Sequence, residues 1–234
     1  MFEFFANIVI FISINLKKRV FFDKKKRIFK KLETIAIFGG TFDPIHNGHI
    51  AIATSILEKK LADRLVILPS FTPPHKQNRI ITDFSHRMAM LKIAFKEWDN
   101  IEISDLEYRL NLEKSYTFEV MKEVEKVYNG AKLKLIIGGD SLKNIHTWYK
   151  AQELVSKYDI ITYPRVGEEL VFNDLEKILT HENIEKLQKN IINAPFFEIS
   201  STILKKKLAN NENASIFIKD EVLEYIKLNK LYNN

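Results

Sequence analysis

The sequence predicts an α/β protein with a Rossmann-like, doubly wound parallel sheet and a small C-terminal helical part. From residue 34 onward, short apolar runs alternate with segments of helical periodicity, and the order is strand then helix throughout. The chain has 234 residues, of which 46% are hydrophobic, so it is long enough to bury one full core. These observations favour one globular domain over residues 32–234, preceded by an atypical segment over residues 1–31.

Each predicted element is a short run with a clear periodicity. The expected strands are Ile35–Phe38, Arg64–Leu68, Ile101–Ser104, Leu133–Ile137 and Asp159–Tyr163, with a further short one around Phe196–Ile199. Helices are expected over residues 49–61, 85–97, 117–128, 150–157, 174–189, 201–209 and 219–228. Two connections, Pro69–Asp83 and Leu106–Lys114, are expected to be mobile loops of the kind that often bind ligands. Because ligands of such sheets bind beyond the carboxyl ends of the strands, residues after each strand are the functional candidates.

The net charge of +6 is concentrated at the start of the chain. Residues 1–31 carry nine Lys and Arg against Glu3 and Asp23, a net charge of +7, which leaves residues 32–234 with a net charge of −1. Because residues 32–234 are nearly neutral, they lack the excess of positive charge that nucleic-acid binding requires. No nucleic-acid partner is therefore expected. The absence of cysteine excludes a disulfide framework and a Cys-ligated zinc site.

Residues 1–31 have two interpretations. Phe2–Leu16 is mostly apolar and the basic run Lys17–Lys31 follows it, which is the reverse of the order in a secretory signal. The apolar part is also shorter than the ~20 residues of a spanning helix. The segment is either a membrane-surface anchor or an extension upstream of a translation start near Lys31. We favour the extension, because all recognisable motifs come later, and therefore expect a cytoplasmic protein without a membrane partner.

The most informative stretch follows the first predicted strand. Residues 39–49 read GGTFDPIHNGH and run directly into a predicted helix. The two glycines let the backbone approach a phosphate closely, and the helix start offers free N–H groups and the positive end of the helix dipole. His46 and His49 are three residues apart at the helix entrance, so both imidazoles can point toward one anionic group. The stretch therefore predicts a phosphate site.

Two known phosphate-binding fingerprints do not fit this stretch, and two other interpretations of its histidines stay open. It is not a dinucleotide-binding GxGxxG, because Thr41 and Pro44 stand where that fingerprint has glycine, and it lacks the GK[ST] of a phosphate loop. A metal pair formed by His46 and His49 stays open, although no nearby Cys or Glu completes a zinc-type ligand set. A purely structural pair of histidines also stays open.

The HNGH at residues 46–49, after GGTFDP, resembles the signature of the nucleotidyltransferase superfamily related to class I aminoacyl-tRNA synthetases. The chain is too short to be a synthetase. A second signature of that superfamily, ISSTxxR, resembles residues 199–205, which read ISSTILK. Lys205 replaces the arginine, which keeps a positive charge for phosphate but loses the bidentate fork.

Further stretches narrow the resemblance to the bacterial nicotinate-nucleotide adenylyltransferases. They match that family in order and spacing, and with the two signatures they cover nearly all of residues 34–231. These stretches are PPHK at 73–76, RM at 87–88 with ML at 90–91, SYT at 115–117, GGDS at 138–141, TW at 147–148 and PRVG at 164–167. Each is weak alone, whereas the ordered set is specific.

The resemblance implies adenylyl transfer from ATP to nicotinate mononucleotide, giving nicotinate adenine dinucleotide and pyrophosphate in NAD biosynthesis, with Mg²⁺ accompanying ATP. It implies that His46 and His49 are catalytic and hold ATP phosphates. The other ATP-binding residues would be Gly39, Gly40, Thr41, Phe42, Ser200, Ser201, Thr202 and Lys205. No covalent enzyme intermediate is expected, because the sequence contains no recognisable activated nucleophile.

The resemblance also implies an acceptor site. His75 and Lys76 would lie near the mononucleotide phosphate, and Asp140 near the ribose hydroxyls. Trp148 would stack on the pyridine ring, while Thr117 and Tyr149 would donate backbone N–H groups to the nicotinate carboxylate. Structural roles stay open for several of these residues: Trp148 as core, His75 and Lys76 as a solvated loop, and Ser200–Thr202 as a helix cap.

Three alternatives to this function stay open. A sibling adenylyltransferase would act on nicotinamide mononucleotide or on phosphopantetheine, and a regulator would keep the fold without turnover. Trp148 argues against phosphopantetheine, which has no flat ring to stack, and Lys205 is the only departure that points to a regulator. The sequence is compatible with a homo-oligomer and does not reveal the oligomeric state.

Overall fold

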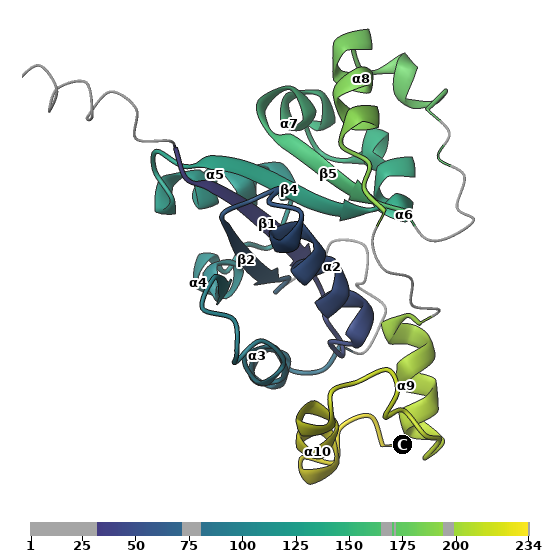
Figure 1. Cartoon of the computed structure of the whole chain (residues 1–234). Coiled ribbons are helices and arrows are strands. Elements are labelled where there is room, and N and C mark those ends of the chain that lie inside the picture. Colours follow the sequence, from purple (N-terminus) through teal and green to yellow (C-terminus); the bar gives the residue numbers. More distant parts are fainter. Residues whose placement is uncertain (1–31, 72–80, 165–169, 171, 194–198, 234) are drawn as a thin grey trace, which may run out of the picture. The chain divides into compact units, whose positions relative to one another are not determined.

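Five parallel strands form the centre of the fold, in the spatial order β3-β2-β1-β4-β5 (Figure 1). The computed structural model describes residues 32–71, 81–164, 170, 172–193 and 199–233. The strands are β1 (Thr34–Gly40), β2 (Arg64–Pro69), β3 (Ile101–Ile103), β4 (Lys132–Gly138) and β5 (Asp159–Tyr163). The chain adds strands first on one side of β1 and then on the other, so the predicted doubly wound, Rossmann-like sheet is confirmed.

The register of the strands brings several loops to one edge of the sheet. Gly40 at the end of β1 is paired with Pro69 at the end of β2, and Gly138 at the end of β4 is paired with Tyr163 at the end of β5. All four strands are parallel, so their carboxyl ends lie at the same edge. The segments after these strands therefore meet there, which is where ligands bind in this type of sheet.

Helices cover both faces of the sheet because side chains along each buried strand alternate between two cores. On β1, Ala36 and Phe38 belong to one buried cluster and Ile35 and Ile37 to another. The first cluster is closed by α2 (Asn47–Glu58), α3 (Phe84–Ala94), α9 (Ser201–Ala209) and α10 (Asp220–Leu228). The second is closed by α4 (Leu106–Leu110), α5 (Thr117–Val127), α6 (Gly139–Lys143), the 3-10 helix η1 (Ile145–Thr147), α7 (Ala151–Lys157), the 3-10 helix η2 (Leu175–Lys177) and α8 (His181–Lys189).

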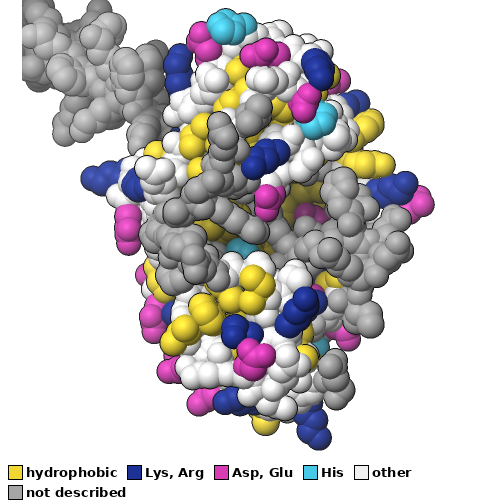
Figure 2. Space-filling model, turned by 90° about the vertical axis from the view of Figure 1, so that its right-hand side faces the viewer, with side chains coloured by type: hydrophobic (Ala, Val, Ile, Leu, Met, Phe, Trp, Pro, Cys, Tyr) yellow, Lys and Arg dark blue, Asp and Glu magenta, His cyan; other side chains and the backbone are white. Residues whose placement is uncertain are grey.

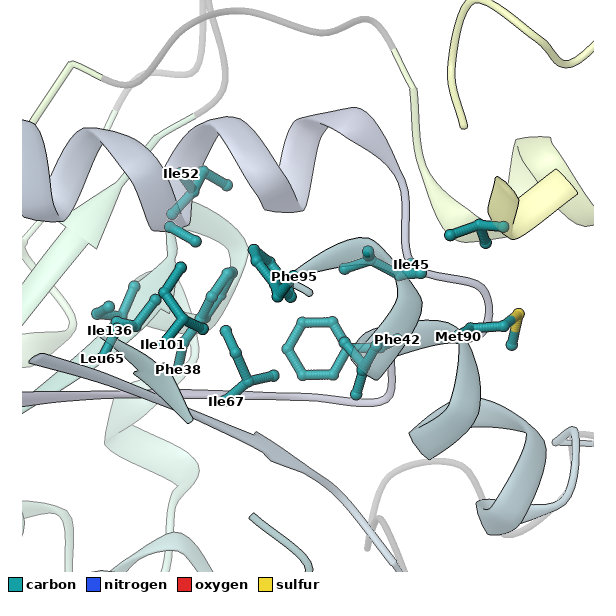
Figure 3. Packing of buried hydrophobic residues seen from close by; sticks show 14 of the residues in the cluster. Phe38, Phe42, Ile45, Ile52, Leu65, Ile67, Met90, Phe95, Ile101 and Ile136 are labelled. Atoms are coloured by element: carbon teal, nitrogen blue, oxygen red, sulfur yellow. The ribbon is translucent and has the colours of Figure 1, made fainter. Parts of the chain in front are cut away.

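The loop between β1 and α2 is anchored in the first cluster. Phe42 and Ile45 are buried and extend this cluster beyond the end of β1 (Figure 3). The rings of Phe38 and Phe42 meet edge to face, with 5.4 Å between their centroids. Burying side chains of this size contributes about 1.5–3 kcal/mol each. The burial of Phe38 and Phe42 holds the loop in place and leaves residues 39–41, which lie between them in the chain, accessible.

Some elements differ from the sequence-based predictions. The loop expected at Leu106–Lys114 begins with α4, because Leu106 and Glu107 are buried against the sheet. The helix expected over residues 174–189 is divided into η2 and α8, because the Thr180 hydroxyl accepts a hydrogen bond from the backbone N–H of Asn183 (3.3 Å) and caps a new helix. The predicted strand around Phe196–Ile199 lies mostly outside the described residues, and Ile199 is in no strand.

The C-terminal helical part is attached to the start of α2 and to α3. The backbone N–H of Asn47 donates to the carbonyl of Phe217 (2.8 Å), and the Asn47 amide donates to the carbonyl of Ile216 (3.1 Å). On α10, the Tyr225 hydroxyl and the His86 imidazole on α3 are 2.9 Å apart. Glu33–Asn234 form one compact unit.

The atypical segment over residues 1–31 lies outside the described residues, so its two interpretations stay predictions. Within the part of the chain that the structure describes, no helix combines the length and the apolarity needed to cross a membrane.

Candidate active site

A cavity of about 390 Å³ opens at the carboxyl ends of β1 and β4. Figure 2 shows a hollowed face of the molecule, with hydrophobic side chains and a histidine visible in the hollow. The volume is in the range of small-molecule sites, ~300–1,000 Å³. Eight predicted site residues line the cavity: Gly39, Gly40, Thr41, Phe42, His49, Thr117, Trp148 and Tyr149.

Gly39 and Gly40, the last two residues of β1, are glycine for different structural reasons. At Gly39 an added Cβ would meet only the carbonyl oxygen of Leu68, at 4.0 Å, so this exposed backbone faces the open cavity. At Gly40 an added Cβ would lie 2.9 Å from the ring of Phe42. Phe42 itself has a φ of 49°, a left-handed conformation that is uncommon for a bulky residue. Gly39 therefore lets a ligand approach, whereas Gly40 makes room for the buried ring that anchors the loop.

His46 and His49 form a stacked pair at the start of α2. Their ring centroids are 3.7 Å apart and the planes are inclined by 28°. The backbone N–H of His46 donates to Nδ1 of His49 (3.4 Å), so in the neutral ring the proton of His49 is assigned to Nε2. His49 lines the cavity and His46 is buried beneath it. Two N–H groups that the sequence suggested would be free at this helix start have partners: that of Asn47 donates to the carbonyl of Phe217 (2.8 Å) and that of His49 to the carbonyl of His46 (2.9 Å). The pair therefore places a ring N–H donor at the positive end of the helix dipole.

The second signature lies against the first. The Ser201 hydroxyl donates to the carbonyl of Pro44 (3.0 Å), and Lys205 forms an ion pair with Asp43. The Ser200 hydroxyl accepts from the backbone N–H of Ile203 (3.3 Å), which confirms the capping role that the sequence left open for it. Thr202 is exposed on the first turn of α9. None of these α9 residues lines the cavity described above.

Asp43 is the centre of the contacts between the two signatures. Its carboxyl is 4% exposed, and it accepts hydrogen bonds from the Tyr232 hydroxyl (2.8 Å), from the backbone N–H of Thr82 (3.3 Å) and from Lys205. Burial alone would raise the pKa of Asp43, but the hydrogen bonds from Lys205, Thr82 and Tyr232 lower it below its ordinary value. Asp43 is therefore a buried carboxylate that stays ionised.

Arg87 holds three backbone segments around the same region. Its side chain is 2% exposed, and its guanidinium donates to the carbonyls of Thr41, Ser70 and Thr82, each at 2.9 Å. Burial lowers the pKa of Arg87, and nearby Asp43 opposes that shift. The planar guanidinium has five N–H donors in fixed directions, so it can bind three carbonyls at once. A lysine ammonium has no such fixed arrangement of donors.

Glu107 is a buried acid in the cavity wall. It is 6% exposed, and its carboxylate accepts a hydrogen bond from the backbone N–H of Phe71 (3.2 Å). Burial raises the pKa of Glu107 to about 7, and this hydrogen bond offsets the rise only in part. The carboxyl therefore changes charge near neutral pH.

The opposite end of the cavity is aromatic. Trp148 is partly buried against the second cluster and Tyr149 is exposed; the rings of Tyr149 and Tyr116 lie 4.9 Å apart. Thr117 is the first residue of α5, so its N–H is one of those that a helix start leaves without an intrahelical partner. Asp140 is exposed on α6 and does not line this cavity, although Ser141 does. His75 and Lys76 lie outside the described residues.

Several residues of the site were not predicted. Arg87 and Asp43 stand inside stretches that carried the resemblance, but no pattern in the sequence indicates their contacts. Glu107 and Tyr232 belong to no quoted motif. A charged residue inside an apolar helical pattern, as Arg87 is among Met88, Met90 and Leu91, was the one signal available.

Comparison with known proteins gives consistent matches. A family described as Cytidylyltransferase-like matches residues 37–207, from β1 into α9. This chain is similar to the probable nicotinate-nucleotide adenylyltransferase of Clostridium tetani, with 36% identity over 199 residues that cover 84% of this chain and 98% of that protein. It is also similar to the nicotinate-nucleotide adenylyltransferase of Bacillus subtilis, with 32% identity over 209 residues, 87% of this chain and 100% of that protein.

The fold has a counterpart among solved structures. The structure of Plasmodium falciparum nicotinic acid mononucleotide adenylyltransferase complexed with NaAD matches with a TM-score of 0.69 and 22% identity. The match covers 86% of this chain and 97% of that one. At this identity the likeness shows a shared fold.

Proposed function

Because the chain belongs to the nicotinate-nucleotide adenylyltransferase family, we propose that it transfers the adenylyl group of ATP to nicotinate mononucleotide. The products are nicotinate adenine dinucleotide and pyrophosphate, a step of NAD biosynthesis. One observation carries the proposal: a single cavity joins the glycine turn and His49 to Trp148 and Tyr149. A phosphate-binding wall and an aromatic wall are what the two substrates together require.

The reaction needs positioning more than covalent chemistry. An oxygen of the mononucleotide phosphate attacks the α-phosphorus of ATP in line, and the bond from that phosphorus to the bridging oxygen breaks as pyrophosphate leaves. Charge spreads over the phosphoryl oxygens during this step, so fixed donors aimed at them supply most of the rate. We assign that role to His49, to His46 and to the positive end of the α2 dipole.

The glycine turn and α9 are the proposed ATP phosphate site. Gly39 lets the phosphates approach the backbone at the end of β1, and Gly40, Thr41 and Phe42 continue this wall. Ser200, Ser201, Thr202 and Lys205 on α9 are proposed to grip the leaving pyrophosphate end. Support comes from the contacts that join α9 to the signature loop at Pro44 and Asp43.

Nicotinate mononucleotide is proposed to bind at the aromatic end. Trp148 stacks on the pyridine ring, and the backbone N–H groups of Thr117 and Tyr149 bind the carboxylate. The start of α5 at Thr117 favours an anion there, which supports the acid over the neutral amide. Asp140 is proposed to bind ribose hydroxyls, and His75 and Lys76 the acceptor phosphate.

Mg²⁺ is proposed as the ion that accompanies ATP, as the family's use of ATP implies a divalent metal. Among the described residues, no three or more His, Cys, Asp or Glu side chains are grouped to hold a metal ion. Mg²⁺ commonly keeps several waters and binds substrate phosphates together with one or two carboxylates. The phosphates of ATP are therefore its proposed ligands, and we assign no step to an ion held by the protein alone.

The cytoplasm is proposed as the place of the reaction, with residues 32–234 as the nucleotidyltransferase domain. All the residues assigned above lie in that range. Cell fractionation of the full chain and of a version that starts at Leu32 tests this. Equal recovery of both in the soluble fraction supports the extension, whereas pelleting of the full chain alone favours the membrane-surface anchor.

Pyrophosphate release by the purified protein tests the function. The protein is given ATP and Mg²⁺ with either nicotinate or nicotinamide mononucleotide. His46→Ala is expected to lower turnover by about 10²–10³-fold, the cost of removing one preorganised donor. His181→Ala is the matched control, because His181 is exposed on α8 and should leave turnover unchanged. Preference for the amide would reassign the substrate, and inactivity with both would favour a nucleotide-binding regulator.

A further inference from the structure

The C-terminal end of the chain reaches the phosphate-binding loop through one tyrosine. After α10 ends at Leu228, Leu231 and Tyr232 pack against the first hydrophobic cluster. The hydroxyl of Tyr232 donates to Oδ1 of Asp43 (2.8 Å). Asp43 lies three residues before His46, inside the loop to which the ATP phosphates are assigned.

The backbone at this end is held in an uncommon conformation. Tyr232 has a φ of 64°, and Lys230 has a φ of 51°. Both are in the left-handed region, which is costly for a residue with a side chain and for a bulky one in particular. Packing of Leu231 and the contact with Asp43 hold this conformation, so the tail has a defined structure at Tyr232.

Tyr232 and Lys205 share the Asp43 carboxyl. Lys205 is bound to Oδ2 of Asp43, while Tyr232 is bound to Oδ1. The Lys205 ammonium also lies 5.6 Å from the centre of the Tyr232 ring. The Asp43 side chain is 4% exposed and that of Lys205 is 30% exposed, so the lysine can turn outward whereas the carboxylate cannot.

We propose that Tyr232 is a positioning residue for Lys205: its hydroxyl stabilises the buried Asp43 carboxylate, so that the lysine can be shared with the phosphates of ATP. The inference rests on the proposed function, in which Lys205 grips the leaving pyrophosphate end.

The physical reason is the cost of a buried charge. As the Lys205 ammonium moves toward a phosphate, it stabilises the Asp43 carboxylate less. The carboxylate is buried, so it cannot turn to water instead. The Tyr232 hydroxyl and the Thr82 N–H then remain as its donors. Burial and the nearby Asp43 raise the pKa of Tyr232, so the hydroxyl keeps its proton and its role as donor. Without this hydroxyl, Asp43 retains Lys205 more tightly and ATP must compete for it.

Tyr232→Phe tests the inference, because it removes the hydroxyl and keeps the ring beside Lys205. The KM for ATP, measured by pyrophosphate release with nicotinate mononucleotide saturating, is expected to rise about ten- to a hundred-fold, the range for losing a hydrogen bond to a charged group. The KM for nicotinate mononucleotide should stay within about twofold. Tyr225→Phe is the matched control, since its hydroxyl bonds His86 between α10 and α3; the KM for ATP should not change.

A double-mutant cycle with Lys205→Gln separates positioning from a general structural effect. If Tyr232 acts through the lysine, Tyr232→Phe should add less than about twofold to the KM for ATP once Lys205 is replaced. An undiminished effect in that background would overturn the inference, as would an unchanged KM for ATP in Tyr232→Phe alone or an equal rise in both KM values.

The outcome is also distinguishable from failure of the proposed function. If the unmodified protein turns over neither mononucleotide, the proposed function fails on that measurement alone. Calorimetric titration of ATP into the same variants then tests the inference directly, because weaker ATP binding by Tyr232→Phe, but not by Tyr225→Phe, is still expected. Equal ATP affinity in both variants would overturn it.

Discussion

The two ends of the cavity are built differently. Behind the phosphate end, Arg87 and Asp43 do not line the cavity; they are almost fully buried and bind the backbone or side chains of five separate segments. At the aromatic end, Trp148 is partly buried and Tyr149 is exposed, and the main contacts are between rings. The phosphate end is held by hydrogen bonds to charged side chains, and the aromatic end by packing of rings near the surface.

This difference matches what each end is proposed to do. Donors that stabilise developing charge are effective only when they need no rearrangement during the reaction. A ring that stacks on a pyridine tolerates small displacements, because stacking is weakly directional. Substitutions at the phosphate end should therefore affect stability and turnover together, whereas substitutions at the aromatic end should affect substrate affinity alone.

Arg87→Met should give the largest effect and is the strongest test of the rigid end. It removes the donors of three buried carbonyls and keeps an apolar side chain of similar length. The free energy of unfolding should fall by about 3–5 kcal/mol, measured by chemical denaturation. Arg109→Met is the control: its ion pair with Asp105 is exposed, so a loss of less than about 1 kcal/mol is expected. A loss at Arg87 no larger than the control would remove the distinction between the two ends.

Glu107 lies between the two ends, and its proton makes stability depend on pH. Burial raises its pKa from 4.5 to about 7, so the folded protein binds this proton more tightly than the unfolded chain does. The stability contributed by this group is fully present below pH 4.5 and is lost as the pH rises through about 7. The loss is of the order of 3 kcal/mol, at about 1.4 kcal/mol per pKa unit. In Glu107→Gln, denaturation at about pH 5 and about pH 8 should show a correspondingly smaller difference; an unchanged difference contradicts the prediction.

Trp148→Ala should leave the fold nearly intact and weaken acceptor binding. Stacking of a ring on an aromatic side chain contributes about 1–3 kcal/mol, so the KM for nicotinate mononucleotide should rise about tenfold or more. The KM for ATP should stay within about twofold. Trp148→Phe, which keeps an aromatic ring, should recover most of the affinity. A rise in the KM values for both ATP and nicotinate mononucleotide would contradict the prediction. It would show that the phosphate and aromatic ends of the cavity are energetically coupled.

The sequence predicted the scaffold and the signatures because both depend on local patterns. Strand and helix order follow from apolar periodicity, and the turn at residues 39–49 follows from glycine and helix-start chemistry. Five of the predicted residues that line the cavity come from this turn, whereas Thr117, Trp148 and Tyr149 were implied by the family resemblance alone. The structure brings these separate stretches of sequence together around one cavity.

The contacts that hold the site together could not be predicted, because they join residues far apart in the chain. Asp43 meets Tyr232 across 189 positions, and Arg87 reaches Thr41 across 46. Nothing in the local pattern around Tyr232 distinguishes it from an ordinary C-terminal residue. Burial likewise decides that Glu107 lies in a cavity wall, although its segment is rich in charged residues and was expected to be a loop.

Lys205→Arg should have the smallest effect and sharpens the comparison within the phosphate end. The arginine restores the residue of the ISSTxxR signature, and the partly exposed position leaves room for its longer side chain. Its fork can bind Asp43 and a phosphate oxygen together, so the gain in geometry offsets the change in length. The kcat/KM for ATP should change by less than about threefold. A drop of tenfold or more would mean that the surroundings of Lys205 are as rigid as those of Arg87, and that the lysine is required for this particular arrangement of Asp43 and Tyr232.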